Sequence, residues 1–297
     1  KWRAAKIIPS GGIIIDHSPV AFLRRPGMQA LPVPELDAGP DDLAELRELL
    51  NVGDDDTWRL ILAFHIGAMR PAGLYPILCV NGEQGSGKST ICRTIRRLID
   101  PNKSDLRSAP RDERDLIIAA SNSHLLGFDN ISSISPAMSD ALCRISTGAG
   151  FATRELYSDD GERIFNVCRP VIVNGIGNLL DQPDLLDRSL VVMLSPIRDS
   201  RRRSEAEFWA EYERIRPRIL GALITATATA MGREATIDLP DRPRMADFAQ
   251  CICAAEPALG VPAGSLIEAY RRNRSAAGEI AIEASAVAAA IIDLIDR

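Results

Sequence analysis

The sequence predicts an α/β protein built around a largely parallel sheet, on three observations. Between about residues 75 and 198, short apolar runs typical of buried strands alternate with stretches of helical spacing, as in a chain of βα units. Residues 77–98 contain a strand, a glycine-rich loop and a helix in that order. Beyond Ser204 the pattern is helical and alanine-rich. We therefore expect a P-loop domain between a smaller N-terminal region and a helical C-terminal domain.

The glycine-rich loop has the spacing of a nucleotide-binding motif. It follows an apolar run at residues 77–80, precedes a helical pattern, and reads G-x-x-x-x-G-K-S. The glycines let backbone N–H groups turn onto phosphates, and the helix start adds the positive end of its dipole. In such loops the lysine reaches the β- and γ-phosphates and the serine hydroxyl ligates Mg²⁺. The sequence thus predicts that ATP or GTP, with Mg²⁺, is bound by Gly82, Glu83, Gln84, Gly85, Ser86, Gly87, Lys88, Ser89 and Thr90.

Three regions are expected along the chain. Residues 1–74 contain a hairpin that turns at residues 9–12, then a proline-rich strap and two helices, one starting at Asp41 and Asp42 and one around residues 57–69. Residues 75–200 form the P-loop ATPase core. Residues 201–297 form the helical domain, with proline breaks near Pro217, Pro240 and Pro262.

Composition limits the class of protein. The chain has 297 residues, a formal charge of −5, six scattered cysteines without a C-x-x-C pair, and three isolated histidines. This cysteine usage favours reduced, buried thiols over a disulfide framework or a zinc site. No apolar run reaches membrane length and no signal peptide is visible, so we expect a soluble cytoplasmic protein with no membrane partner. The first residue is Lys1, as in a fragment of a longer chain.

A second motif lies at residues 125–130. An apolar run ends in Asp129, where the strand that supplies the metal-binding aspartate of a P-loop ATPase is expected to end. We expect Asp129 to hold Mg²⁺ through water, together with Ser89. Asn130 stands where most such enzymes have an acid that orients the attacking water. An amide hydrogen-bonds water but does not accept its proton, so Asn130 predicts slow turnover.

A third motif follows two later apolar runs. Asn174 comes directly after the run at residues 171–173, at the position of a sensor asparagine that contacts the γ-phosphate and the lytic water. Arg188 precedes the run at residues 190–194. It is interpreted either as a surface charge or as an arginine that reaches the nucleotide of a neighbouring subunit.

Between these motifs a T-G-x-G segment at residues 147–150 is followed by Arg154 and Tyr157. With the motifs in this order, residues 75–198 resemble the AAA+ ATPases of the superfamily-three helicase type, especially the primase-helicases of phages and other mobile elements. The resemblance implies a hexameric or heptameric ring with ATP between subunits. In such a ring Lys88, Ser89, Asp129 and Asn174 would act in cis, and Arg188 would act in trans. Single-stranded or forked DNA and a primase domain or protein are the partners that it implies.

The family also carries a DNA-gripping hairpin before the sensor strand. We expect it at residues 151–157 and 163–167, with the tip sequence SDDGE. Asp159, Asp160 and Glu162 make this tip acidic, which opposes contact with phosphates. Arginine clusters at residues 24–25, 214–218 and 271–274 are interpreted as solvated or ion-paired, and Arg201, Arg202 and Arg203 as the best site for DNA.

Three functional hypotheses remain from the sequence. The first is an ATP-hydrolysing AAA+ motor that unwinds or remodels DNA in the replication of a phage or mobile element. The second is a slow, nucleotide-gated oligomeric switch or scaffold that does not translocate. The third is a small-molecule or nucleotide kinase, which shares the P-loop but has no need of the later Asn174 and Arg188.

Overall fold

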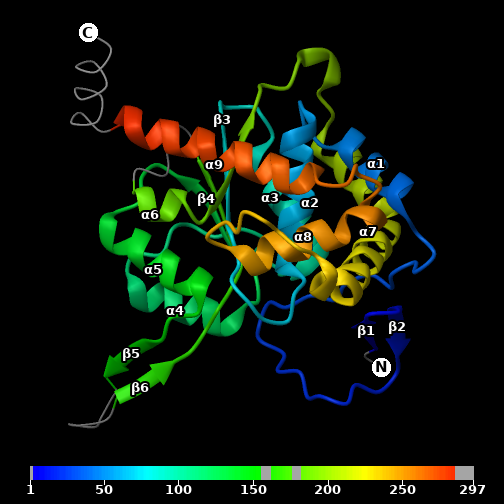
Figure 1. Ribbon diagram of the computed structural model, residues 1–297, viewed down its shortest axis with the longest axis horizontal. Helices are drawn as coiled ribbons and strands as arrows, with labels where there is room; N and C mark the ends of the chain where they lie inside the picture. The colour runs from blue at the N-terminus through cyan, green and yellow to red at the C-terminus, as the bar shows by residue number, and fades with distance from the viewer. Residues whose placement is uncertain (1–2, 155–161, 176–181, 285–297) are drawn as a thin grey trace.

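The computed structural model describes residues 3–154, 162–175 and 182–284, and its centre is a four-stranded sheet (Figure 1). The strands are β3 (Ile77–Gly82), β4 (Leu126–Ile131), β7 (Val171–Gly175) and β8 (Ser189–Leu194). Their order across the sheet is β4-β7-β3-β8 and every pair is parallel, so all the carboxyl ends lie at one edge. The predicted α/β class with a largely parallel sheet is confirmed.

Helices cover both faces of the sheet, because successive side chains of a strand point to opposite faces. In β3, Leu78 and Val80 belong to the larger hydrophobic core, and Ile77 and Cys79 belong to the smaller one. Helices α1, α2, α3, α7, α8 and α9 contribute to the larger core, and α4, α5 and α6 contribute to the smaller one. The helices are α1 (Pro40–Leu49), α2 (Asp55–Ala68), α3 (Lys88–Ile99), α4 (Glu113–Asn122), α5 (Pro136–Thr147), α6 (Pro183–Leu186), α7 (Glu205–Arg233), α8 (Ala246–Leu259) and α9 (Ser265–Ala284).

The N-terminal region forms the elements that its sequence predicts. Strands β1 (Ala4–Ile8) and β2 (Gly11–Ile15) pair antiparallel as a hairpin, and α1 and α2 follow. The strap between hairpin and α1 crosses α7: the N–H of Glu35 donates to the carbonyl of Pro217 at 3.1 Å. The contact is so close that a Cβ on Gly221 would lie 1.7 Å from the carbonyl oxygen of Glu35. Glycine is therefore required where the strap crosses the helix.

One predicted helix break is wrong. Helix α7 continues through Pro217, although an internal proline removes a hydrogen bond and costs a helix about 3 kcal/mol. Tyr212 and Ile219, on either side of Pro217, are fully buried, so the packing of α7 offsets that cost. Pro240 and Pro262 lie between helices, as predicted.

A second hairpin precedes β7, as expected. Strands β5 (Phe151–Arg154) and β6 (Glu162–Phe165) pair antiparallel with Phe151 opposite Phe165. Figure 1 shows this hairpin extending away from the body of the molecule. The predicted acidic residues Asp159 and Asp160, together with Tyr157, lie outside the described residues.

The predicted domain boundaries after residues 74 and 200 stay predictions. Leu43, Val80 and Leu223 come one from each predicted region and belong to the same hydrophobic core. Among the described residues, no helix has the length and apolar character needed to cross a membrane.

Candidate nucleotide site

The predicted nucleotide-binding residues 82–90 extend from the last residue of β3, through the loop that follows it, to the first turn of α3. Gly82, Gly85 and Gly87 have φ angles of 153°, 78° and 85°, which side-chain-bearing residues rarely adopt. Gly82 also lies close to its neighbour, since a Cβ there would be 2.5 Å from the carbonyl oxygen of Leu194. The glycines therefore allow the chain to turn from β3 directly into α3. The first N–H groups of α3 have no partner within the helix and remain free to bind phosphate.

Lys88 is the first residue of α3, and its ammonium group lies inside the loop. Its Nζ donates to the carbonyl oxygens of Gly82 and Glu83, both at 2.7 Å. These bonds hold a positive charge at the centre of the loop. Of the other predicted ligands, Glu83, Gln84 and Gly85 are exposed, Thr90 is half-buried, and Ser86 is buried with its hydroxyl unpaired within the described structure.

Ser89 and Asp129 are in contact at the carboxyl ends of the sheet strands. The Ser89 hydroxyl donates to Oδ1 of Asp129 at 2.9 Å, and Asp129 lies on β4, two strands from β3. Two oxygens that occupy neighbouring positions around an octahedral Mg²⁺ are about 2.9 Å apart, because each lies about 2.0–2.1 Å from the ion. The pair therefore fits Mg²⁺. No group of three or more His, Cys, Asp or Glu side chains suited to a metal occurs in the described chain, so phosphate oxygens and waters would complete the coordination.

Asn130 and Asn174 form a β-bulge beside this pair. Between Phe128 and Ile131 the register of β4 against β7 shifts, and Asn130 adopts the left-handed region with φ of 55°. The N–H of Asn130 donates to the side-chain oxygen of Asn174 at 2.9 Å, and the Asn174 amide donates to Sγ of Cys92 at 3.4 Å. Asn174 is 1 % exposed, so its amide positions the bulge. Its predicted contact with a γ-phosphate stays a prediction.

Asn51 is a residue of this site that the sequence did not reveal. Its side-chain amide donates to the carbonyl of Ser86 at 2.9 Å and to that of Ser195 at 2.7 Å. It thereby joins the P-loop to the end of α1 and to the segment after β8. No motif marks Asn51, because its partners lie far away in the sequence and the contacts depend on the tertiary fold.

A cavity of about 580 Å³ adjoins the P-loop on the side of α1 and α7. The P-loop contributes Gly87 and α3 contributes Thr90, while Phe208 and Trp209 of α7 provide aromatic walls. Arg201, Arg202 and Arg203, which the sequence favoured for DNA, line the same cavity. Its volume lies in the range of small-molecule sites.

Arg188 lies at the amino ends of the sheet strands, whereas the P-loop of its own chain lies at their carboxyl ends. Its carbonyl accepts the N–H of Ile77 at 3.0 Å, at the start of β3, and the P-loop begins at the other end of that strand. Five residues of strand span about 17 Å, so the guanidinium cannot reach the nucleotide site of its own chain. It donates instead to the carbonyl of Asp184 at 2.8 Å and forms an ion pair with the Asp184 carboxylate, whose pKa it lowers.

Two other arginine clusters are ion-paired, as the sequence predicted. Arg214, Arg216 and Arg218 pair with acids on α1 and α7. Arg271, Arg272 and Arg274 pair with acids that include Asp56 and Asp187. These charges are therefore engaged within the protein.

The cysteines and His65 are buried or half-buried in the described chain. All six cysteines are free thiols, and burial raises the pKa of Cys92 to about 12 and of Cys143 to about 11. They are thus neutral at physiological pH and poor nucleophiles. His65 of α2 is 1 % exposed, and its Nδ1 donates to the carbonyl of Ile61 at 2.8 Å. Its Nε2 has no partner among the described residues, and burial lowers its pKa to about 4.

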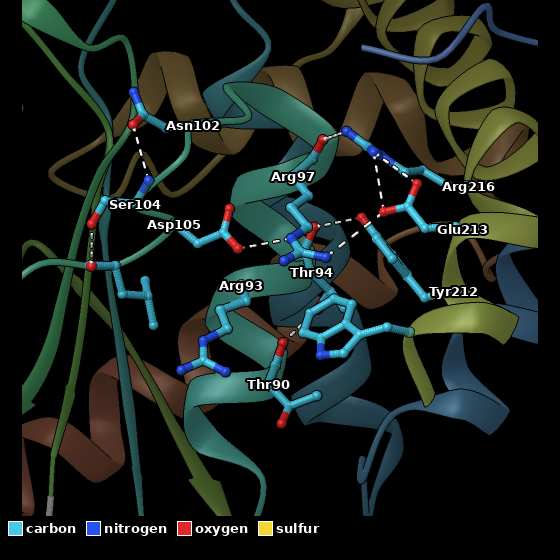
Figure 2. A network of polar contacts seen from close by, with 12 residues as sticks. Thr90, Arg93, Thr94, Arg97, Asn102, Ser104, Asp105, Tyr212, Glu213 and Arg216 are labelled. Carbon is cyan, nitrogen blue, oxygen red and sulfur yellow. Dashed lines mark hydrogen bonds and ion pairs between the residues drawn. The ribbon is translucent and has the colours of Figure 1, made fainter. Parts of the chain in front are cut away.

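A polar network joins α3, which begins at the P-loop, to α7 (Figure 2). The Arg97 guanidinium donates to Asp105 at 2.7 Å and lies 3.9 Å from the ring centre of Trp209. The Arg97 carbonyl accepts from Arg216 at 2.6 Å, and the Tyr212 hydroxyl donates to the carbonyl of Thr94 at 2.9 Å. The two helices are thus held together along their length by directional contacts.

The sequence matches a known family over most of its length. Residues 43–276 match the family model described as "Actinomycete integrative conjugative element replication protein". No curated protein sequence matches the chain.

Solved structures show more distant similarity. An apo structure of the NrS-1 C-terminal region matches 68% of this chain and 49% of that one, at 14% identity and a TM-score of 0.46. A second structure of that region matches 73% and 56%, at 14% identity and the same TM-score of 0.46. A JCV helicase structure matches 76% of this chain and 74% of that one, at 11% identity and a TM-score of 0.36. The chain spans about half the length of the NrS-1 region.

Proposed function

Since the chain belongs to the family of actinomycete integrative conjugative element replication proteins, we propose that it binds and hydrolyses ATP with Mg²⁺ as a ring-forming motor in the replication of such an element. Single-stranded or forked DNA is the proposed substrate, and a primase domain or protein is the proposed partner. These assignments rest on the ordered motifs of residues 75–198 and their resemblance to superfamily-three helicases.

The observation that carries the proposal is the 2.9 Å hydrogen bond between Ser89 and Asp129 beside the ammonium group of Lys88. A cation-binding oxygen pair and a fixed positive charge are the groups that phosphoryl transfer requires, because its catalysis is mainly positioning and charge stabilisation. Bound Mg²⁺ would neutralise charge that develops on the phosphates. Ser89 and Asp129 would hold the ion, and Lys88 would hold the β- and γ-phosphates.

The position of Arg188 supports a ring. Its guanidinium lies at the edge of the sheet opposite the P-loop of its own chain, so any contact with a nucleotide has to be made in another subunit. In such an assembly each site is completed by its neighbour.

A slow nucleotide-gated switch is the second candidate, and Asn130 favours it. Asn130 is exposed beside Asp129, where its side chain can orient a water but cannot remove its proton. A ring with this residue would hold ATP for longer between turnovers. DNA-stimulated hydrolysis separates the motor from the switch.

The test is ATP binding and hydrolysis by Lys88→Ala and Asp129→Ala, with Lys103→Ala as a matched control because Lys103 is an exposed lysine away from the loop. We expect Lys88→Ala to abolish ATP binding or turnover, Asp129→Ala to lose Mg²⁺-dependent turnover with the fold intact, and Lys103→Ala to behave as wild type. Mass in solution should rise from monomer to ring with ATP. Undiminished hydrolysis by Lys88→Ala would exclude this active site.

A further inference from the structure

The segment that follows β8 turns back over the P-loop. The N–H of Ile197 donates to the carbonyl of Gly85 at 3.3 Å. The Ile197 side chain would lie 3.3 Å from a Cβ on Gly87, and the carbonyl of Ser195 is bound by Asn51. This segment is therefore a wall of the nucleotide site, held by bonds to the loop itself.

Arg202 reaches the loop from this wall. Its guanidinium Nη2 lies 3.7 Å from where a Cβ of Gly85 would be. Within the described structure its ion pair is with Asp199, three residues earlier, at 3.3 Å, with side chains 61 % and 92 % exposed. Exposed pairs of this kind contribute little free energy. The guanidinium can therefore exchange Asp199 for a stronger anionic partner at small cost.

Positive charge predominates around this wall. Arg201 and Arg203 line the cavity with Arg202, and Lys88 lies inside the adjoining loop. Of the two acids that line the cavity, Glu205 already accepts from Arg93 and Trp209, while Glu48 is exposed. Guanidinium groups match phosphate geometry and form charge-assisted, bidentate hydrogen bonds with it. The arrangement thus suits a polyphosphate.

We propose that Arg202 binds the phosphates of the nucleotide held by its own P-loop, so that the arginines of segment 201–203 belong to the nucleotide site. This inference rests on the proposed function, and it assigns to ATP a cluster that the sequence favoured for DNA. The cavity beside Gly87 and Thr90, of about 580 Å³, leaves room for the base and ribose. Arg202 would act in cis, in contrast to Arg188.

The experiment measures three affinities of the full chain: for ATP, for inorganic tripolyphosphate and for single-stranded DNA. The variants are Arg202→Ala, Arg202→Lys and the control Arg198→Ala, which removes an exposed arginine of the same segment that does not line the cavity. We expect Arg202→Ala to weaken ATP and tripolyphosphate binding about tenfold, as for loss of one charge-assisted contact. Arg202→Lys should recover part of this loss, and Arg198→Ala should bind both ligands as wild type does.

Unchanged ATP affinity in Arg202→Ala, or a loss confined to DNA, overturns the inference. If Lys88→Ala abolishes ATP binding while Arg202→Ala does not weaken it, the proposed function stands and this inference alone fails. Mixing Arg202→Ala with Lys88→Ala chains tests the cis assignment. Each site in such a mixture lacks one cis residue, so hydrolysis at limiting ATP should not exceed that of the Arg202→Ala chains alone, and a rise above that level would show that Arg202 acts across an interface.

Discussion

The side-chain oxygen of Asn174 accepts the backbone N–H of Asn130 at 2.9 Å, where the backbone pairing of β4 and β7 shifts register. The bond spans this irregularity, and it fixes the backbone of the residue next to Asp129. A buried amide thus determines how the carboxyl end of β4 presents its polar side chains.

Asn174→Ala should therefore destabilise the protein and slow turnover together. The N–H of Asn130 loses its acceptor in a part-buried hydrogen bond, and such a bond contributes about 0.5–1.5 kcal/mol. Urea unfolding measures this loss. The control is Cys92→Ala, which removes the other partner of Asn174 but leaves the bulge bonded, so turnover should change less. Equal effects on turnover would show that the bond to Asn130 has no special role.

Asn130→Asp should raise the rate of ATP hydrolysis. Aspartate is an acid of nearly the same size as asparagine and also tolerates the left-handed backbone at φ of 55°. A general base typically increases the rate of a reaction by a factor of about 100 or more. We expect at least a tenfold gain in kcat under this estimate. Asn130→Gly keeps the backbone angle without a side chain and should give no gain. A rate for Asn130→Asp at or below that of wild type contradicts the explanation of slow turnover.

Arg188→Ala should behave as an interface defect. Mixed with Lys88→Ala chains, it should restore part of the hydrolysis that both variants lack alone, because some interfaces then combine an intact loop with an intact arginine. Asp184→Asn is the control: it removes the ion-pair partner of Arg188 and leaves the arginine in place. If Arg188 serves only that ion pair, the two variants lose equal stability and the mixture stays inactive.

Arg97→Ala should cost more stability than Arg93→Ala, although both arginines lie on α3 (Figure 2). Arg97 contacts Trp209, and its partner Asp105 is only 12 % exposed; we expect a loss of about 1–3 kcal/mol. Arg93 and Glu205 form a pair that is 37 % and 74 % exposed, for which the expected loss is below about 1 kcal/mol. Thermal or urea unfolding of both variants gives the comparison, and the reverse order contradicts it.

His65 should make the protein less stable in acid. Burial lowers its pKa from 6.5 to about 4, so between these values the unfolded chain binds a proton that the folded chain does not. The free energy of unfolding is unaffected by His65 above pH 6.5 and falls by about 1.4 kcal/mol per pH unit below it, until about pH 4. His65→Leu should flatten the wild-type slope in this window, and His17→Asn, at an exposed position, should not. An unchanged slope in His65→Leu contradicts the assignment.

Local sequence patterns predicted the helices and strands well, but they did not predict contacts between residues far apart in the chain. The loop at residues 82–89 and its strand and helix were predictable because spacing and apolar runs are local properties. Pro217 misled the prediction because the packing of Tyr212 and Ile219, which sustains the helix, is tertiary. The Asn51 contacts and the approach of Arg202 to Gly85 join segments far apart in the chain. Neither the residue types nor their spacing in the sequence predicts such contacts.

The crossing of Glu35 and Gly221 sets an order of events during synthesis. The strap cannot form its native contacts until α7 has been synthesised. Gly221 leaves the ribosome roughly 190 residues after Glu35, and the synthesis of that stretch takes about 10–40 s at typical translation rates. Through that interval the N-terminal hairpin and strap have no helix to pack on, and apolar side chains such as Ile7 and Leu36, which pack against the core of the folded protein, are exposed to water or bound by chaperones. The native crossing then forms by closing a long loop, a step that slows folding. A stalled or truncated nascent chain that ends before α7 would thus be a target for proteolysis.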